Sequence, residues 1–342
     1  MMLSLLLLAF ADGAATAAPA AAPCATLQPA CSEPPPLSGA TLVTVTGRAG
    51  PATEAGSRAD LSLARLNAVR TASGTRPVAP SDVLVLSAAR HAAYLSDNGF
   101  RSAPSIHGET AGATGFSGAD PFVRMRAAGY RSSYATEVVG DIGSVATDAD
   151  CVDHLMNTIY HAALLLSRVT EAGVAYGTRG AAGACVIDLG APLAPPEPQA
   201  AAPREIVRYP WPGMTMPTGS FHLASENPRP SLALLPAAIV GSPVLVGLRR
   251  AGAVAAGSGA LGVELQTFEL RDARDAPVPG VVLADAAITG PGVMADGALH
   301  GGFAVLMPRK PLAPGRYRVI LHATIGADVV APAPWTFVVA AP

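Results

Sequence analysis

Residues 118–130, which read GADPFVRMRAAGY, carry the clearest local signal in this sequence. Pro121 suits the first turn of a helix, because the N–H that proline lacks would have no partner there. Phe122 and Met125 follow at a spacing that predicts they face inward, and Gly129 is a typical end of a helix. The segment therefore predicts a short helix that follows a long loop, and the neighbouring elements can be placed on either side of it.

Three helices and two strands are predicted around this segment. Apolar residues at helical spacing indicate helices over residues 61–72, 81–98 and 149–166. Residues 173–176 and 184–189 are strand-like and are bounded by glycines, which is typical of a hairpin. Helices followed by strands, in a segment of about 130 residues, predict an α+β fold.

The composition divides the chain into five parts. They are a signal peptide at 1–22, a Pro/Ala-rich tail at 23–58, an α+β domain at 59–191, a Pro/Ala linker at 192–205 and a β-sandwich at 206–342. In the last part, short apolar runs alternate with Pro and Gly turns, as in an all-β sandwich.

A glycine motif in the β-rich part needs a separate interpretation. Residues 257–262 fit G-x-G-x-x-G, the pattern of a dinucleotide-binding loop. Such a loop must open a helix, whereas residues 263–270 alternate like a strand. The motif is therefore predicted to be a glycine-rich β loop, and no cofactor is expected there.

The N-terminus predicts export. An apolar run at residues 3–10, followed by small residues up to Ala22, is typical of a secretory signal and is too short to span a bilayer. The expected location is secreted, periplasmic or cell envelope. Cys24 leaves a lipid anchor open, although Pro23 stands where a small residue is expected. No later stretch reaches about 18 uninterrupted apolar residues, so no transmembrane span is expected.

The four cysteines fit an oxidising compartment and allow three pairings. Cys24–Cys31 with Cys151–Cys185 is the favoured arrangement, because the first two share the tail and the last two share a folded region. Two buried free thiols in the folded region remain the alternative.

The charge balance excludes one class of partner. The chain has 23 basic and 25 acidic residues, a formal net charge of −2, and 50% hydrophobic residues. A nucleic-acid-binding surface needs clustered positive charge, so nucleic acid is not an expected partner. The apolar half of the sequence is ample for a core and excludes general disorder. The expected partner is an extracellular or cell-envelope ligand, and the sequence leaves the oligomeric state open.

An ordered set of motifs carries a family resemblance. In chain order they are Leu66-Asn67-x-x-Arg70, Ala88-Ala89-x-x-Ala92-x-x-Leu95, His107, residues 118–130, Glu137, Leu155-Met156-x-Thr158-x-Tyr160-His161 and Glu171-x-Gly173-x-Ala175. The set resembles the CAP superfamily of cysteine-rich secretory, antigen 5 and pathogenesis-related 1 proteins, and most of all its bacterial secreted branch. That resemblance implies an α-β-α sandwich with a cleft.

The resemblance also implies the site residues. In the family the cleft holds two histidines and two acidic residues, which bind a divalent cation in several members. By motif position, His107 and His161 look like the histidines and Glu137 looks like one acidic residue. The second acidic residue has no clear counterpart; the candidates are Glu109, Asp150 and Asp153.

The residue types themselves allow three kinds of chemistry. Two imidazoles and a carboxylate could hold Zn²⁺ or another divalent cation with an open position. Without metal, His107 or His161 beside Glu137 could act as a general base. The third possibility is a hydrogen-bonded clamp that holds the long loop on the helix. His154 is interpreted as a surface residue more than an extra ligand, and His91 as a structural residue.

Three functions follow from these alternatives. The leading hypothesis is a non-enzymatic binding module whose cleft takes a divalent cation or a partner. The second is an extracellular hydrolase, protease-like, that uses His107, Glu137 and His161. The third, lipid or sterol binding, rests on the family resemblance.

The β-rich part carries a resemblance of its own. Residues 311–319, which read PLAPGRYRV, are followed by Trp335-x-Phe337. This order resembles the late strands of bacterial immunoglobulin-like domains, in which a Pro-Gly turn leads into a strand and a tryptophan closes the core. The resemblance implies an immunoglobulin-like sandwich that serves as a stalk, spacer or interaction module.

Overall fold

The computed structural model describes most of the chain beyond the N-terminal tail. The described residues are 57–100, 105–141, 150–180, 182–193, 204–226, 230, 235, 238–250 and 262–341. All of them belong to one compact unit. Among them no helix is long and apolar enough to cross a membrane. The predicted signal peptide and the Cys24–Cys31 pair lie outside the described residues.

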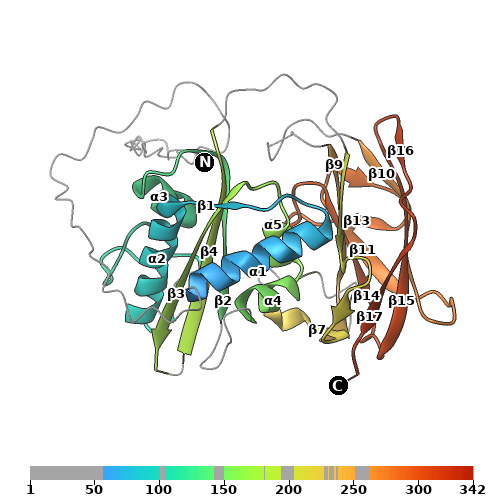
Figure 1. Ribbon diagram of the computed structural model, residues 1–342, viewed down its shortest axis with the longest axis horizontal. Coiled ribbons are helices and arrows are strands. Elements are labelled where there is room, and N and C mark those ends of the chain that lie inside the picture. The colour runs from blue at the N-terminus through green and yellow to red at the C-terminus, as the bar shows by residue number, and fades with distance from the viewer. Residues whose placement is uncertain are drawn as a thin grey trace, which may run out of the picture. The chain divides into compact units, whose positions relative to one another are not determined.

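The first part of the unit combines helices with a small sheet (Figure 1). The helices are α1 (Arg58–Ser73), α2 (Asp82–Asp97), α3 (Pro121–Ala127), α4 (Asp150–Met156) and α5 (Tyr160–Leu165). The strands are β1 (Ala79–Pro80), β2 (Ser132–Asp141), β3 (Glu171–Arg179) and β4 (Ala182–Pro192), in the order β1-β3-β4-β2. The α+β prediction is confirmed, and β3 and β4 form the predicted antiparallel hairpin.

The two faces of this sheet are covered by different helices. Val186 of β4 packs with Ala88 and Ala92 of α2. Ile187, the next residue, belongs to the cluster that contains Leu66 of α1. Successive strand residues point to opposite faces, so α2 covers one face and α1 covers the other. The result is three layers, helix, sheet and helix.

Glycine on β3 allows helix α2 to lie directly on the sheet. A Cβ placed on Gly173 would stand 2.1 Å from the backbone carbon of Leu84 and the backbone nitrogen of Val85. A Cβ on Gly177 would stand 2.1 Å from the carbonyl oxygen of Ala92. This close approach fixes the height of α2 over the sheet, and with it the loop that follows α2.

The predicted continuous helix over residues 149–166 is wrong. The structure has two short helices, because α4 ends at Met156 and α5 begins at Tyr160. The hydroxyl of Thr158 donates to the carbonyl oxygen of Leu155 at 2.6 Å. The backbone N–H groups of Ile159 and Tyr160 both donate to a side chain from the β-rich part, described below. These side-chain contacts replace helical hydrogen bonds at the break.

In the short helix α3, the predicted burial of Met125 is confirmed and that of Phe122 is wrong. Its N-cap is Asp120, whose carboxylate accepts the N–H of Val123 at 3.0 Å. Met125 is buried as predicted, whereas Phe122 is 57% exposed. Arg124 takes the buried position instead, at 1% exposure, because its guanidinium binds the carboxylate of Glu137 and the carbonyl oxygen of His107. A buried ion pair thus overrides the hydrophobic pattern here.

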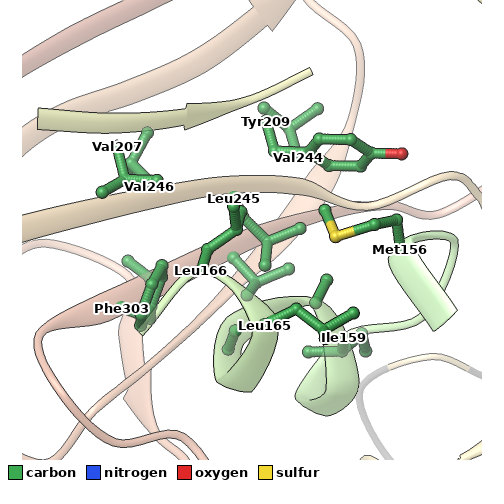
Figure 2. Close-up of a cluster of buried hydrophobic side chains, with 14 of the residues drawn as sticks. Met156, Ile159, Leu165, Leu166, Val207, Tyr209, Val244, Leu245, Val246 and Phe303 are labelled. Atoms are coloured by element: carbon green, nitrogen blue, oxygen red, sulfur yellow. The ribbon is translucent and has the colours of Figure 1, made fainter. Parts of the chain in front are cut away.

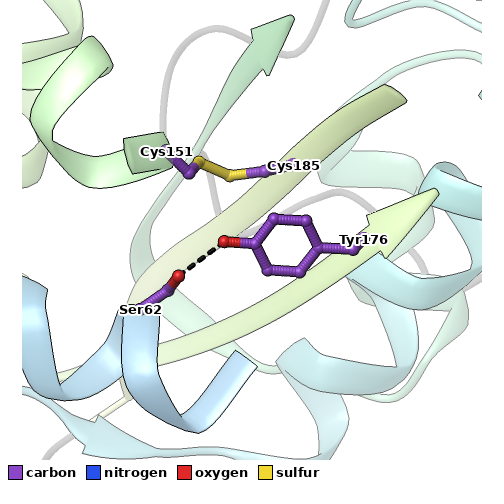
Figure 3. Close-up of a disulfide and its surroundings, with 4 residues drawn as sticks. All are labelled: Ser62, Cys151, Tyr176 and Cys185. Carbon is purple, nitrogen blue, oxygen red and sulfur yellow. Dashed lines mark hydrogen bonds between the residues drawn. A yellow bond between two sulfur atoms is a disulfide. The ribbon is translucent and has the colours of Figure 1, made fainter. Parts of the chain in front are cut away.

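One disulfide joins helix α4 to the sheet. Cys151 and Cys185 are bonded, with Cα atoms 6.4 Å apart and a sequence separation of 34, which confirms this half of the predicted pairing. Figure 3 shows the disulfide near the hydrogen bond between Ser62 of α1 and Tyr176 of β3. The bond therefore links the layer of α1 and α4 covalently to β4.

The second part is almost entirely β, as predicted. Its strands are β5 (Arg204–Tyr209), β6 (Thr215–Met216), β7 (Ser220–His222), β8 (Ile239–Gly241), β9 (Val244–Arg250), β10 (Val263–Arg271), β11 (Gly280–Ala284), β12 (Ile288–Thr289), β13 (Val293–Ala295), β14 (Phe303–Pro308), β15 (Gly315–Ile325), β16 (Asp328–Val330) and β17 (Trp335–Val339). They form sheets in the orders β12-β10-β15-β17-β6 and β13-β11-β14-β9-β5, with β16 beside β15 and a separate β7-β8 pair. Strand β10 follows the glycine motif, so that motif does not open a helix.

The two parts share a hydrophobic core. Figure 2 shows Ile159 and Leu166 beside side chains of β5 and β9, among them Val207 and Leu245. All four residues are at most 1% exposed and belong to one buried cluster. The α+β part and the β-rich part are therefore packed together. The domain boundary at the linker 192–205 stays a prediction.

Candidate functional site

His107 and Glu137 are held together on the α2 side of the sheet. His107 lies in the loop between α2 and α3, and Glu137 lies on β2 with a fully buried side chain. His107 Nδ1 stands 2.9 Å from Glu137 Oε1. Arg124 of α3 donates from one guanidinium nitrogen to Glu137 Oε2 at 2.7 Å. Both carboxylate oxygens of Glu137 are thus engaged by neighbours within the protein.

Charges around Glu137 keep it ionised. Burial by itself raises the pKa of Glu137, but the hydrogen bond from His107 and the charges of His91, Arg124 and His107 outweigh burial and hold that pKa below its usual range. An ionised carboxylate can only accept, so His107 must carry its proton on Nδ1. The Nε2 of His107 then has a free lone pair.

A second buried pair anchors the loop that carries His107. His91 of α2 is fully buried, and its Nδ1 lies 2.9 Å from Glu109 Oε1. Its Nε2 lies 2.9 Å from the carbonyl oxygen of Ile106. Both ring nitrogens of His91 therefore lie within hydrogen-bond distance of an oxygen. Glu109 also accepts the N–H groups of Ser117 at 2.6 Å and Gly118 at 3.2 Å.

Arg124 connects this loop to the rest of the site. Besides binding Glu137, it donates to the carbonyl oxygen of His107 at 2.9 Å and to that of Gly118 at 3.4 Å. Its side chain is fully buried, and its Nε lies 3.7 Å from Glu109. A connected set of buried polar side chains thus fixes the position of His107; its members are His91, Glu109, Arg124 and Glu137.

His161 on α5 is held by different partners. Its Nδ1 lies 3.0 Å from the hydroxyl oxygen of Thr158. That hydroxyl already donates its hydrogen to the carbonyl oxygen of Leu155. It can therefore only accept a hydrogen bond from His161, so His161 carries its proton on Nδ1. A carboxylate oxygen of Glu226 lies 3.9 Å from the same Nδ1. Like His107, His161 is left with a free lone pair on Nε2.

The two histidines interact electrostatically. Burial, followed by the charges of His107 and His154, lowers the pKa of His161 from 6.5 to about 4. The side chains of His107 and His161 are 31% and 17% exposed. The hydrogen bonds of both rings to the described residues are made at Nδ1.

A three-ligand metal centre of His107, Glu137 and His161 stays a prediction of the sequence. Glu137, the predicted third ligand, uses one oxygen for His107 and the other for Arg124. Within the part of the chain that the structure describes, no group of three or more His, Cys, Asp or Glu side chains is placed to hold a metal ion. Glu137 instead orients His107 from behind, the role that carboxylates have beside many histidine ligands.

Two of the three candidates for the second acidic residue have other partners. Glu109 binds His91, as described above. Asp153 binds Arg65 of α1 through an exposed ion pair at 2.7 Å. Asp150 begins α4, and its side chain lies outside the described residues. His154 is exposed, in agreement with its interpretation as a surface residue.

Two buried carboxyl groups that the sequence did not single out lie close to these residues. Asp188 is fully buried on β4, directly opposite Glu137 of β2. Its position within the apolar run of residues 182–192 could have indicated a special role, since a lone acidic residue rarely occurs in a buried strand. Glu226 is 2% exposed and belongs to the β-rich part, so no local pattern could have connected it with His161.

The first part of the chain matches a model of a known protein family. Residues 63–189 match the model of the cysteine-rich secretory protein family, CAP. No curated protein matches the chain. An outer surface protein from Borrelia burgdorferi is 17% identical over 39% of this chain and 92% of its own, with a TM-score of 0.32. PcoC, a methionine-rich copper resistance protein from Escherichia coli, is 19% identical over 28% of this chain and 79% of its own, with a TM-score of 0.18.

The family match covers helix α1 from Leu63 through most of β4, and so includes His107, Glu137 and His161. Glu226 lies beyond it. Residues 63–189 therefore form a domain of the cysteine-rich secretory protein family, the CAP family.

Proposed function

We propose that this chain is an exported, non-enzymatic binding module whose CAP domain recognises its ligand through His107 and His161. The observation that carries the proposal is the shared state of the two rings. Each Nδ1 is held by an acceptor, and each Nε2 has a free lone pair. The proposal is that these two lone pairs converge on one ligand, either a divalent cation or N–H and O–H donors on a cell-envelope partner.

A divalent cation fits this site only in a limited way. The two imidazoles can supply nitrogen ligands, and Glu137 would support His107 without touching the cation. Zinc sites with an open position have three protein ligands as a rule. The remaining ligands here would come from water or from the partner, so we expect weaker binding than at a complete protein site.

Hydrolysis receives less support than binding. A general base works best when its pKa lies near the operating pH. The pKa of His161 is lowered to about 4, mainly by burial, so at neutral pH the ring is neutral but only weakly basic. That state suits a ligand-binding nitrogen better than a group that must remove a proton.

Export is supported by three observations. The N-terminal sequence resembles a secretory signal. The family whose model matches is described as secretory. The disulfide between Cys151 and Cys185 is buried, and such bonds persist in oxidising compartments. We therefore place the protein outside the cytoplasm, at the cell surface, in the periplasm or in the medium.

Zinc titration by calorimetry on the full chain tests the proposal, because Zn²⁺ probes directly for two converging imidazole lone pairs. His107→Ala and His161→Ala each remove one lone pair. His300→Ala is the matched control, since His300 is exposed and lies in the β-rich part.

The proposal expects one zinc ion per chain at neutral pH. Binding should be lost in both cleft variants and retained in the control. A wild type that binds no zinc, or binding that survives either cleft variant, would show that the two histidines do not form a joint binding site.

A further inference from the structure

A carboxylate from the β-rich part reaches into the CAP domain. Glu226 directly follows the short 3₁₀ helix η1 (Leu223–Ser225), well beyond the matched segment 63–189. Its side chain is fully buried. Burial of a carboxyl group costs free energy unless its oxygens accept hydrogen bonds or face opposite charge, so the partners of each oxygen of Glu226 matter.

One oxygen of Glu226 caps helix α5. Oε1 accepts the N–H of Ile159 and the N–H of Tyr160, the second at 3.1 Å. The residue at the N-cap of α5 is Ile159, whose apolar side chain cannot accept these hydrogen bonds. Glu226 thus supplies, from a distant part of the chain, the cap that the local sequence lacks.

The other oxygen faces the ligand-binding histidine. Oε2 has no hydrogen-bond partner among the described residues, although it is buried. It lies 3.9 Å from His161 Nδ1. Burial raises the pKa of Glu226 from 4.5 to about 7, so its charge is present mainly above neutral pH. In the ionised form, an oxygen at this distance favours an N–H at Nδ1 and disfavours a lone pair there. Glu226 therefore acts on His161 in the same sense as the hydroxyl of Thr158.

A second contact from the β-rich part holds the same helix turn. The hydroxyl of Tyr160 donates to Asp296 Oδ2 at 2.8 Å. Tyr160 is adjacent to His161 in sequence, so both carboxylates act on the turn that presents the histidine. The apolar contacts of Ile159 and Leu166 with β5 and β9 hold this turn against the β-rich part (Figure 2).

We propose that the β-rich part is a component of the binding site, with Glu226 as the positioning residue that fixes the tautomer and orientation of His161. This inference rests on the proposed function for its biological meaning, because it explains how His161 keeps its Nε2 lone pair available. It assigns to the β-rich part a role beyond that of a stalk or spacer. Glu226 would also be the second acidic residue of the site, since Glu109 binds His91 and Asp153 binds Arg65.

The test compares Glu226→Gln and Glu226→Ala with Glu264→Gln in the full chain. Glutamine keeps an oxygen for the N–H groups of α5 but can place an amide N–H toward His161 Nδ1. Alanine removes both effects. Glu264 is an exposed residue of β10 and serves as the control. The readout is the tautomer of His161, measured by ¹⁵N NMR of the histidine side chains.

The expected result is an Nδ1–H tautomer in the wild type and in Glu264→Gln. In Glu226→Gln we expect the ratio of the two tautomers to change on the order of tenfold toward Nε2–H. In Glu226→Ala we expect a smaller change in the same direction. Zinc affinity should fall in the same order, because the Nε2 lone pair is what binds the cation.

The outcomes separate the two proposals. An unchanged tautomer in both Glu226 variants would overturn the role of Glu226, whatever happens to zinc binding. Loss of cooperative unfolding in Glu226→Gln would also overturn it, because the carboxylate would then be a requirement of the fold and not of the histidine. If the tautomer changes but the wild type binds no zinc, Glu226 keeps its positioning role and only the proposed cation binding fails.

Discussion

Asp188 of β4 lies directly opposite Glu137 of β2, and both carboxyl groups are buried. Two like charges side by side in the interior cannot both remain ionised at low cost. The pKa of Glu137 is lowered, whereas burial and the neighbouring charge of Glu137 raise the pKa of Asp188 well above its usual range. The pair therefore holds one negative charge, on Glu137, and that charge binds His107 and Arg124.

The first prediction concerns Asp188→Asn. The folded-state pKa of Asp188 is raised above its ordinary value of 3.8, so its contribution to stability is fully present below about pH 3.8 and is lost as pH rises through the folded-state pKa. Asparagine imitates the neutral acid and does not titrate. The difference in the free energy of unfolding, variant minus wild type, should therefore increase as pH rises from 4 to 9. A constant difference across this range would show that Asp188 is ionised in the folded protein.

The second prediction concerns Glu137→Ala. This substitution removes the carboxylate that pairs with the buried guanidinium of Arg124 at 2.7 Å, and breaking a buried ion pair in this way costs about 3–5 kcal/mol. Asp153→Ala is the matched comparison, because it breaks the exposed pair with Arg65 and should cost about 1 kcal/mol or less. Urea denaturation of both variants measures the difference. Equal destabilisation would contradict the structural role assigned to Arg124 and Glu137.

The third prediction concerns the packing of α2 on the sheet. Gly173→Ala would place a methyl group 2.1 Å from the backbone of Leu84, and neither backbone can yield easily. We expect a loss of stability of about 3 kcal/mol or more, at the upper end of overpacking costs. Gly297→Ala has open space around the new methyl group and should change the melting temperature little. A tolerated Gly173→Ala would mean that α2 does not lie this close to β3.

The fourth prediction concerns the disulfide. Reduction, or the double substitution Cys151→Ala and Cys185→Ala, opens a loop of 34 residues. Constraint of the unfolded chain by a loop of this length is worth about 3–4 kcal/mol. The measurement is the urea midpoint with and without reductant. The double variant should show no further response to reductant, and a response there would indicate a second disulfide elsewhere in the chain.

The parts of the fold that depend on local signals could be predicted from sequence. Pro121 and Gly129 bound α3 correctly because they act on the backbone of their own segment. The hairpin of β3 and β4 and the β-rich second part were also predictable from alternation and turns. The break between α4 and α5 was not, since the cap at Ile159 comes from Glu226, a residue far away in the sequence.

The site could be predicted in part for the same reason. His107, Glu137 and His161 were found through the order of motifs, and the structure brings the first two into contact. What the sequence could not provide is the direction of each lone pair. That direction depends on Arg124, Thr158 and Glu226, whose partners are set only by tertiary packing. Direct contact of Glu137 with a metal stays a prediction, and in the structure the second oxygen of Glu137 binds Arg124.

A pH titration of His161 by ¹⁵N NMR in the wild type tests the central claim most directly. The claim is that His161 presents a neutral ring with a free Nε2 beside His107. We predict the Nδ1–H tautomer at neutral pH and a ring that stays neutral until the pH approaches about 4. A ring that becomes protonated near its ordinary pKa of 6.5, or one that carries its proton on Nε2 at neutral pH, would contradict the account.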